Sequence, residues 1–306
     1  MRPAAGVVLR GAQAPWQDRL RHLGLPELLP ASARERLHAA GVPALQGVED
    51  GLAAWGRVAR YAQQRPALLA LGESALVPLC PPPLAGASRL LNEWNAKQAL
   101  RGFGLPIPQG VLSSPQRALA DAGQVGFPLV LKAVSAQLPH KTEAGAVALN
   151  LADAAALSRA LEQMRTRIAA HAPGVAFDQV LLEPMASAPL AELIVGIKRE
   201  ADFGLALVIG AGGILVELLK DSSSLLLPTT DGAIRKAVLG LRSAALLQGF
   251  RGKPAADLDA LVAAIRAVAD YACENANQLL ELDVNPLMVG AHGTLAVDAL
   301  IRLGQV

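Results

Sequence analysis

Apolar residues recur along this chain with two different spacings. Where they return every three or four positions, with polar residues between them, one face of a helix is apolar and a helix is predicted. Five stretches have this pattern, at residues 32–40, 49–64, 92–103, 153–171 and 255–275. Gly41 and Gly104 follow the first and third of these stretches and indicate where the helices end.

Short runs of consecutive apolar residues predict strands instead. Such runs begin the segment 129–147, make up 179–185, 192–196 and 204–210, and recur as two strands within 280–300. Helices and strands follow one another in an irregular order. This order favours an α+β fold of two subdomains over a doubly wound parallel sheet.

The first 88 residues differ from the rest, because they contain many arginines and no lysine. Three consecutive prolines at 81–83 exclude a helix and favour an extended linker. We therefore predict an N-terminal segment at 1–77, a proline-rich linker at 78–89 and the main domain at 90–306.

Composition limits the classes of protein to consider. Apolar residues make up 52% of the 306 residues and aromatic residues only 3%, so the core must consist mainly of Leu, Ala and Val. The net charge is +2 and no basic run is interleaved with aromatic residues, so we expect no nucleic-acid partner. No apolar run reaches the roughly 18–20 residues that cross a bilayer, and the first twenty residues lack a secretory pattern. We expect a cytoplasmic protein without a membrane partner, in which Cys80 and Cys273 are reduced.

Lys132 lies inside an apolar strand, in the sequence LVLKAVS. Its ammonium group must reach a partner or water, because burying it unpaired is costly. A nucleotide phosphate is one such partner. A lysine that extends from the sheet edge into water is the alternative.

The polar loop after this strand carries His140 and Lys141. An imidazole is nucleophilic at neutral pH and can carry a phosphoryl group. A neighbouring ammonium group can offset charge on the group being transferred. His140 and Lys141 are therefore the candidate catalytic residues, and a purely structural histidine is the alternative.

Glycines cluster where the predicted strand at 204–210 ends. Gly210, Gly212 and Gly213 have no side chain, so the backbone there can approach a phosphate and expose its N–H groups. This makes the three glycines candidates for nucleotide binding. A turn that only joins two strands is the alternative.

Oxygen ligands occur near the C-terminus, where Asn285 and Asp298 lie on two predicted strands joined by a turn at 290–293. Mg²⁺ prefers hard oxygen ligands, and nucleotide enzymes usually give it one or two side chains, leaving the rest to phosphate and water. We predict Asn285 and Asp298 as the metal ligands, with Glu281 and Asp283 as close alternatives. Cations on one side and oxygen ligands on the other are what Mg²⁺ with a nucleoside triphosphate requires.

Taken together, the motifs from about residue 90 to 303 resemble the ATP-grasp part of the NDP-forming acyl-CoA synthetases. These are relatives of the β subunit of succinyl-CoA synthetase and of ADP-forming acetyl-CoA synthetase. The family pattern His-Lys-Ser/Thr-Asp/Glu-x-Gly-Gly-Val matches residues 140–147, except that Ala146 replaces the second glycine. The resemblance implies an ATP-grasp fold with Mg²⁺ and ATP or ADP held between two α+β subdomains.

The resemblance also implies roles for particular residues. His140 would be phosphorylated transiently, and Lys132 would contact nucleotide phosphate. Glu217 belongs to a Val-Glu motif that follows the family's Gly-x-Gly-Gly-Ile. Glu183 lies where the family's hinge strand touches the nucleotide, and a plain strand-end carboxylate is the alternative. Glu192 matches an acidic position of the family, for which nucleotide contact and an internal ion pair both remain open.

Residues 36–61 resemble, more weakly, the last strand–helix unit of the flavodoxin-like ligase domain that precedes the ATP-grasp part in fused synthetases. The strand of this unit would lie at 42–45. A helical adaptor without chemistry is the alternative.

The reaction implied by the resemblance interconverts acyl-CoA, ADP and phosphate with a carboxylic acid, CoA and ATP, through acyl phosphate and phosphohistidine. It also requires a CoA-binding domain and a ligase domain, which 88 residues before the grasp region cannot hold. We therefore expect an acid–thiol ligase that depends on an α-type CoA-binding and ligase subunit, or on further N-terminal domains. The acyl group and the choice between ADP and GDP do not follow from the sequence.

Two other functions remain open at this level. An ATP-grasp ligase that joins a carboxylate to an amine would not phosphorylate His140. A nucleotide-sensing regulatory module would catalyse no reaction. One fold hosts many reactions, so resemblance of fold does not decide among them.

Overall fold

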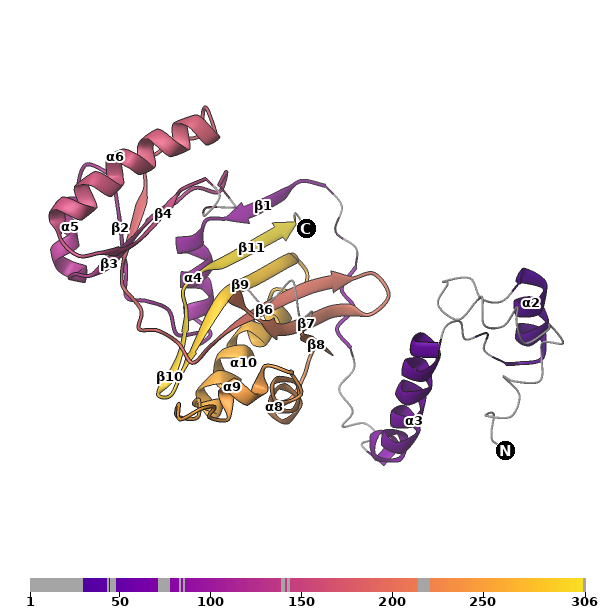
Figure 1. Ribbon diagram of the computed structural model, residues 1–306. Coiled ribbons are helices and arrows are strands. Elements are labelled where there is room, and N and C mark those ends of the chain that lie inside the picture. The colour runs from indigo at the N-terminus through magenta and orange to yellow at the C-terminus, as the bar shows by residue number, and fades with distance from the viewer. Residues whose placement is uncertain are drawn as a thin grey trace. The chain divides into compact units, whose positions relative to one another are not determined.

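The computed structural model contains two antiparallel sheets and describes residues 30–42, 44, 48–70, 78–82, 84, 86–138, 141, 144–213 and 221–304 (Figure 1). The chain divides into two units, Met1–Ala75 and Leu76–Val306. Among the described residues, no helix is long and apolar enough to cross a membrane.

The described residues of the N-terminal unit form helices α2 (Ala31–Ala39) and α3 (Val48–Ala70). Both confirm helices predicted from apolar spacing, and Gly41 follows α2 with φ +68°. The apolar side chains of α3 are largely exposed, with Leu52 at 68% and Trp55 at 48%. The short strand expected at 42–45 falls partly outside the described residues, and Val42 and Ala44 are not in a strand.

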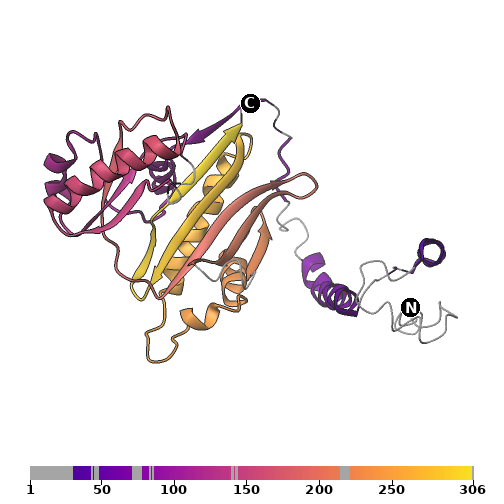
Figure 2. The same cartoon turned by 45° about the horizontal axis from the view of Figure 1, so that its top comes forward.

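The large sheet of the C-terminal unit has seven strands among the described residues, in the order β1-β11-β9-β6-β7-β8, with β10 paired to β9. All of its pairings are antiparallel. Its strands are β1 (Ser88–Leu91), β6 (Ala191–Glu200), β7 (Gly204–Ala211), β8 (Ser222–Leu226), β9 (Leu279–Gly290), β10 (Gly293–Ala296) and β11 (Ala299–Gly304). Helices α4 (Glu93–Arg101), α8 (Asp231–Leu239), α9 (Ala244–Leu247) and α10 (Leu258–Glu274) complete this subdomain (Figures 1 and 2).

The side chains of β6 alternate between the two faces of the large sheet, and this alternation shows which face packs against α10. Leu193, Val195 and Ile197 are buried in one core with the apolar side of α10. Residues at even positions of β6 point to the opposite face, because successive side chains of a strand alternate. Gly196 on that face lies opposite Asp283 of β9. The polar side chains of β9 therefore lie on the face of the sheet that points away from α10.

The small sheet has the order β2-β5-β3-β4 and is also antiparallel. Its strands are β2 (Val111–Ser113), β3 (Leu129–Ala133), β4 (Val147–Leu151) and β5 (Val180–Pro184). Helices α5 (Ala118–Val125) and α6 (Ala154–His171) pack on it and form a second core. The predicted α+β fold with two subdomains is confirmed (Figure 2).

The two strands predicted within 280–300, joined by a turn at 290–293, are confirmed as β9 and β10, but a third strand, β11, follows them, and the placement of Asp298 on a strand was wrong. β9 turns at 290–293 into β10, and the chain then passes Val297 and Asp298 into β11, which pairs with the first half of β9. Asp298 therefore lies between two strands. The backbone carbonyl of Asp298 accepts a hydrogen bond from the backbone N–H of Asn285 at 3.3 Å, so the two predicted metal ligands are neighbours.

The segment predicted as a linker is extended at 78–82 and is bonded to the large sheet. The Leu79 amide donates to the Leu227 carbonyl at 2.7 Å, and the Leu79 carbonyl accepts from the Leu205 amide at 3.0 Å. Gly204 passes so close that a Cβ there would lie 2.1 Å from the Leu79 oxygen. Backbone hydrogen bonds and close packing therefore attach this part of the segment to the large sheet.

Candidate functional site

Six charged side chains meet between the two subdomains, and we call them the charged cluster. They come from α4, from β3 and β5 of the small sheet, from the loop after β3 and from the turn before β11. The members are Glu93, Lys97, Lys132, Lys141, Glu183 and Asp298. Three ammonium groups face three carboxylates, so the cluster is formally neutral.

Lys132 is buried, and its ammonium group has three protein acceptors. It donates to Glu93 Oε1 at 2.7 Å and to the Val297 carbonyl at 2.5 Å, and it pairs with Glu183 Oε2 at 2.9 Å. Burial alone would lower the pKa of Lys132, but Glu93 and Glu183 raise it above its ordinary value. Lys132 is thus a charged lysine whose ammonium group makes two hydrogen bonds and one further ion pair within the protein.

Glu93 joins the cluster to the loop after β3. Its Oε1 accepts from Lys97 and Lys132, while its Oε2 accepts from Lys141. Burial alone would raise the pKa of Glu93, but the charges of Lys132, Lys141 and Lys97 hold it well below its usual range. The Glu93 carboxylate therefore stays ionised in a site from which water is largely excluded.

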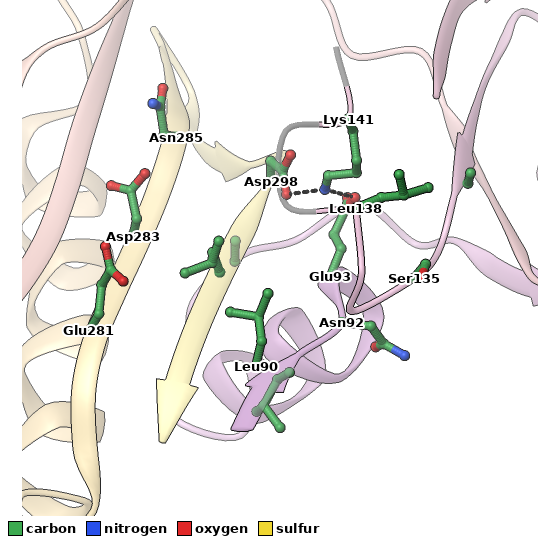
Figure 3. A pocket seen from close by; sticks show the side chains of 14 residues that line it. Leu90, Asn92, Glu93, Ser135, Leu138, Lys141, Glu281, Asp283, Asn285 and Asp298 are labelled. Carbon is green, nitrogen blue, oxygen red and sulfur yellow. Dashed lines mark hydrogen bonds and ion pairs between the residues drawn. The ribbon is translucent and has the colours of Figure 1, made fainter. Parts of the chain in front are cut away.

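Lys141 connects Glu93 to Asp298, whose Oδ1 accepts from the Lys141 ammonium group at 2.7 Å (Figure 3). Partial burial raises the pKa of Asp298, and so does the charge of Glu93, while Lys141 and Lys132 oppose this effect. With these two acceptors, Lys141 keeps one N–H that bonds to no described residue. It also lines the neighbouring cavity, so this lysine can bind an anion there.

The cavity has a volume of about 450 Å³ and lies between β9, β11, the start of α4 and the end of β3. Glu281, Asp283 and Asn285 line one wall at alternate positions of β9, with Asp298 and Lys141 beside them (Figure 3). Burial, together with the charges of Glu281 and Asp298, raises the pKa of Asp283 to about 6. The wall thus combines several carboxylates with little compensating positive charge.

The donor set of this wall fits Mg²⁺. Asp298, Asp283 and Asn285 offer carboxylate and amide oxygens, the ligand type that this ion prefers. Among the described residues, no three His, Cys, Asp or Glu side chains gather as a metal site. A Mg²⁺ ion that keeps phosphate oxygens and water as its other ligands needs only one or two protein side chains. The residues present therefore suit a metal bound together with a nucleotide.

The glycine turn and Glu192 lie together, and neither lines the cavity. The Gly212 amide donates to the Glu192 carbonyl at 2.7 Å, and a Cβ on Gly212 would lie 2.8 Å from that oxygen. Gly213 has φ +71° and sits beside Glu192 Oε2. A Cβ on Gly210 would meet the Asp221 carbonyl at 3.3 Å. Close backbone packing therefore requires glycine at position 212 even without a ligand.

The sequence-based candidates thus separate into groups. Lys141, Asn285 and Asp298 meet at the cavity, whereas Lys132 and Glu183 lie in the charged cluster behind it. Glu192 and the three glycines form a separate group at the ends of β6 and β7. His140 and Glu217 lie outside the described residues.

Sequence reasoning missed Glu93 and Lys97, although both are buried and bonded within the cluster. A signal was available in the predicted helix at 92–103. Glu93 and Lys97 lie four residues apart on the same face as Ala96 and Leu100, which are fully buried. Two charges of opposite sign on the apolar face of a helix indicate a buried ion pair.

The comparisons with known proteins agree with this fold. Residues 84–303 match the family model of an ATP-grasp domain, and the chain therefore belongs to that family.

More specifically, the chain is homologous to the β subunits of ADP-forming acyl-CoA synthetases. It is 33% identical over 223 residues to the β subunit of acetate–CoA ligase [ADP-forming] II from Pyrococcus furiosus, covering 72% of this chain and 94% of the relative. The expected family and enzyme class are thereby confirmed.

Three further matches extend this result. Trans-feruloyl-CoA synthase FCS1 from an unknown prokaryotic organism is 31% identical over 277 residues, which is 89% of this chain but 38% of that protein. A solved structure of acetyl-coenzyme A synthetase 1 from Ca. Korarchaeum cryptofilum, in complex with coenzyme A and Ca-AMPCP, is 29% identical with a TM-score of 0.67. It covers 78% of this chain and 99% of the solved chain. Another structure of that enzyme, 28% identical with a TM-score of 0.61, contains Mg-AMPPCP and a phosphohistidine segment that points towards the nucleotide-binding site.

Proposed function

We propose that this chain binds Mg²⁺ with ATP or ADP at the cavity and transfers the γ-phosphoryl group between the nucleotide and His140. The observation that carries the proposal is the meeting of Lys141 with Asp298 at a cavity that Asp283 and Asn285 also line. A lysine ammonium group beside several oxygen ligands is the combination that a phosphate and its metal ion require.

Each cavity residue has a role in this proposal. Asp298 and Asn285 hold Mg²⁺, which when bound offsets the charge on the phosphate oxygens. Lys141 exchanges its bond to Asp298 for one to a phosphate oxygen, which leaves the carboxylate free for the metal. Lys132 carries its positive charge close behind the cavity, among Glu93 and Glu183. Glu192, Glu217 and the glycine turn would contact the rest of the nucleotide.

The transfer step is a nucleophilic displacement. A ring nitrogen of His140 forms a bond to the γ-phosphorus while the bond from that phosphorus to the β,γ-bridging oxygen breaks, and ADP leaves. In the reverse direction ADP attacks phosphohistidine and ATP forms. His140 is next to Lys141 in the chain, so the nucleophile is attached to a residue that lines the cavity.

The complete reaction requires a partner in this proposal. It interconverts acyl-CoA, ADP and phosphate with a carboxylic acid, CoA and ATP, and the CoA and acyl sites belong to an α-type subunit or to further domains. The relative that matches 89% of this chain is more than twice as long, which supports the need for additional polypeptide. We place the reaction in the cytoplasm, which agrees with the free thiols of Cys80 and Cys273.

The test is incubation with γ-labelled ATP and Mg²⁺, followed by measurement of acid-labile, base-stable phosphate on the protein. We expect label on the native chain and none on His140→Ala. His171→Ala is the matched control, because His171 is an exposed residue at the end of α6, and it should keep the label.

Other results would contradict particular parts of the proposal. Nucleotide binding without label would argue against phosphohistidine and favour a carboxylate–amine ligase. Absence of nucleotide binding would favour a non-catalytic role. Synthesis of acyl-CoA by the isolated chain at full rate would contradict the need for a partner.

A further inference from the structure

Lys97 is a fully buried lysine on α4, and it does not line the cavity. Its ammonium group donates to Glu93 at 2.8 Å, to Glu183 at 2.5 Å and to the Val297 carbonyl at 3.2 Å. Three acceptors use all three of its N–H groups. Lys97 is thus fully engaged within the protein and has no donor left for a ligand.

The Val297 carbonyl is the acceptor that connects Lys97 to the cavity. Lys132 donates to the same oxygen at 2.5 Å, so two ammonium groups hold one peptide unit. The next residue is Asp298. The Val297 amide also donates to the Pro286 carbonyl, so the turn that carries Asp298 is bonded from both sides. The direction of the Asp298 side chain therefore depends on bonds that reach it from α4 and β3.

Lys97 also compensates negative charge in the buried cluster. Glu93 and Glu183 bring two negative charges into a buried region, and Lys97 and Lys132 balance them. Without Lys97 the two carboxylates would share Lys132 and Lys141. The positive charges of both lysines would then be compensated more strongly by these carboxylates. Lys141 would therefore exchange its bonds to Glu93 and Asp298 for a bond to phosphate less readily.

We propose that Lys97 is a positioning residue for the metal side of the cavity. It balances the charges of Glu93 and Glu183, and it holds the Val297 carbonyl. Asp298 and Lys141 are thereby oriented towards the bound nucleotide. This inference rests on the proposed nucleotide site. It assigns to α4 a function beyond packing, although Lys97 itself binds neither the metal nor the nucleotide.

The test uses the full chain with Lys97→Met, which keeps most of the side-chain volume and removes the ammonium group. Mn²⁺ replaces Mg²⁺, because its free concentration can be measured by electron paramagnetic resonance. Loss of a residue that orients a metal ligand typically weakens metal affinity by about 10–100-fold. We expect the Kd of Mn²⁺ in the presence of ADP to rise by a factor in this range, and the Kd of ADP without metal to rise by a smaller factor.

Lys236→Met is the matched control, because it makes the same change on α8, outside the cavity lining. It should leave the Kd of Mn²⁺ unchanged. Circular dichroism and the thermal unfolding midpoint report whether each variant is folded. A purely structural role for Lys97 would lower the unfolding midpoint and leave the Kd of Mn²⁺ for the folded protein as in the native chain.

A second variant covers the case in which Lys97→Met does not fold. Lys97→Gln also removes the charge but can still donate to the Val297 carbonyl, and we expect it to weaken Mn²⁺ binding as well. A folded variant with native Mn²⁺ affinity would overturn the positioning role alone. A native chain that binds neither ADP nor Mn²⁺ would overturn the proposed function, and the inference with it.

Discussion

Glu93 is the residue on which the charged cluster depends most. It is 5% exposed and accepts bonds from three lysines, which come from α4, β3 and the following loop. A buried charge is tolerated only when several partners compensate it. Removing this one carboxylate leaves three ammonium groups with too few acceptors, so its effect should exceed that of a single hydrogen bond.

We expect Glu93→Gln to lower the free energy of unfolding by roughly 3–5 kcal/mol, the usual cost of removing one partner from a buried ion pair. Denaturant unfolding of the chain without nucleotide measures this. Asp259→Asn is the control, because the Asp259 side chain is 90% exposed and pairs with Arg235 at the surface. Its effect should stay below about 1 kcal/mol. Equal effects of the two changes would show that the cluster adds no particular stability.

The predicted roles of Lys132 and Glu183 illustrate the limit of sequence reasoning at this scale. A lysine inside an apolar strand needs a partner, and that argument was correct. The partner could not be named, because Glu93, Glu183 and Val297 lie 39, 51 and 165 positions away in sequence. Whether Lys132 also contacts nucleotide phosphate stays a prediction.

Among the elements, the short helix α9 shows how one carboxylate joins distant segments. Asp221 follows the undescribed residues 214–220 and accepts bonds from the Arg242 and Ser243 amides, both at 2.8 Å, at the start of α9. Burial alone would raise the pKa of Asp221, but these amide bonds lower it below its ordinary value. The ionised carboxylate therefore stabilises the folded chain.

This shift predicts a pH dependence. The pKa of Asp221 is lower in the folded chain than in the unfolded chain, so its contribution is present above the unfolded value and is lost as pH falls through the folded value. We expect Asp221→Asn to cost about 1 kcal/mol near pH 7 and almost nothing near pH 2. Denaturant unfolding at both values measures the difference, and a cost that is independent of pH would contradict this explanation.

Helices and strands differ in how far the sequence predicted them. Long amphipathic helices such as α6 and α10 were predicted within a few residues, because their apolar period repeats over several turns. Short elements such as α5 and α9 were not predicted, because one or two turns contain too little periodicity. The third strand of the C-terminal hairpin was missed, because Asp298 is a single polar residue within the otherwise apolar run at 295–301.

At the scale of the whole molecule, the described residues that form the two hydrophobic cores all follow the boundary at 75/76. The larger core packs the large sheet against α10, and the smaller core packs the small sheet against α5 and α6. The charged cluster joins the two subdomains through side chains from both. The unit Leu76–Val306 therefore contains its own cores and its own cavity.

We expect a chain without residues 1–75 to fold and to unfold in a single cooperative transition, because no described residue of the removed unit belongs to either core. Its affinity for ADP with Mg²⁺ should equal that of the full chain. Thermal unfolding and calorimetric titration of the two proteins measure both properties. A shortened chain that aggregates, or that loses nucleotide affinity, would assign a direct role to the N-terminal unit.

The sequence by itself determined the α+β class, the longer helices and strands, and the motifs that indicate the ATP-grasp family. Each of these is local, since periodicity and short motifs involve residues close together in the chain. Tertiary structure alone decided which charges neighbour one another. Glu93 and Lys97 meet Lys132, Glu183 and Val297 only after two sheets and α4 have packed. That packing excludes water, and exclusion of water makes the partners of a buried charge decisive for both stability and binding.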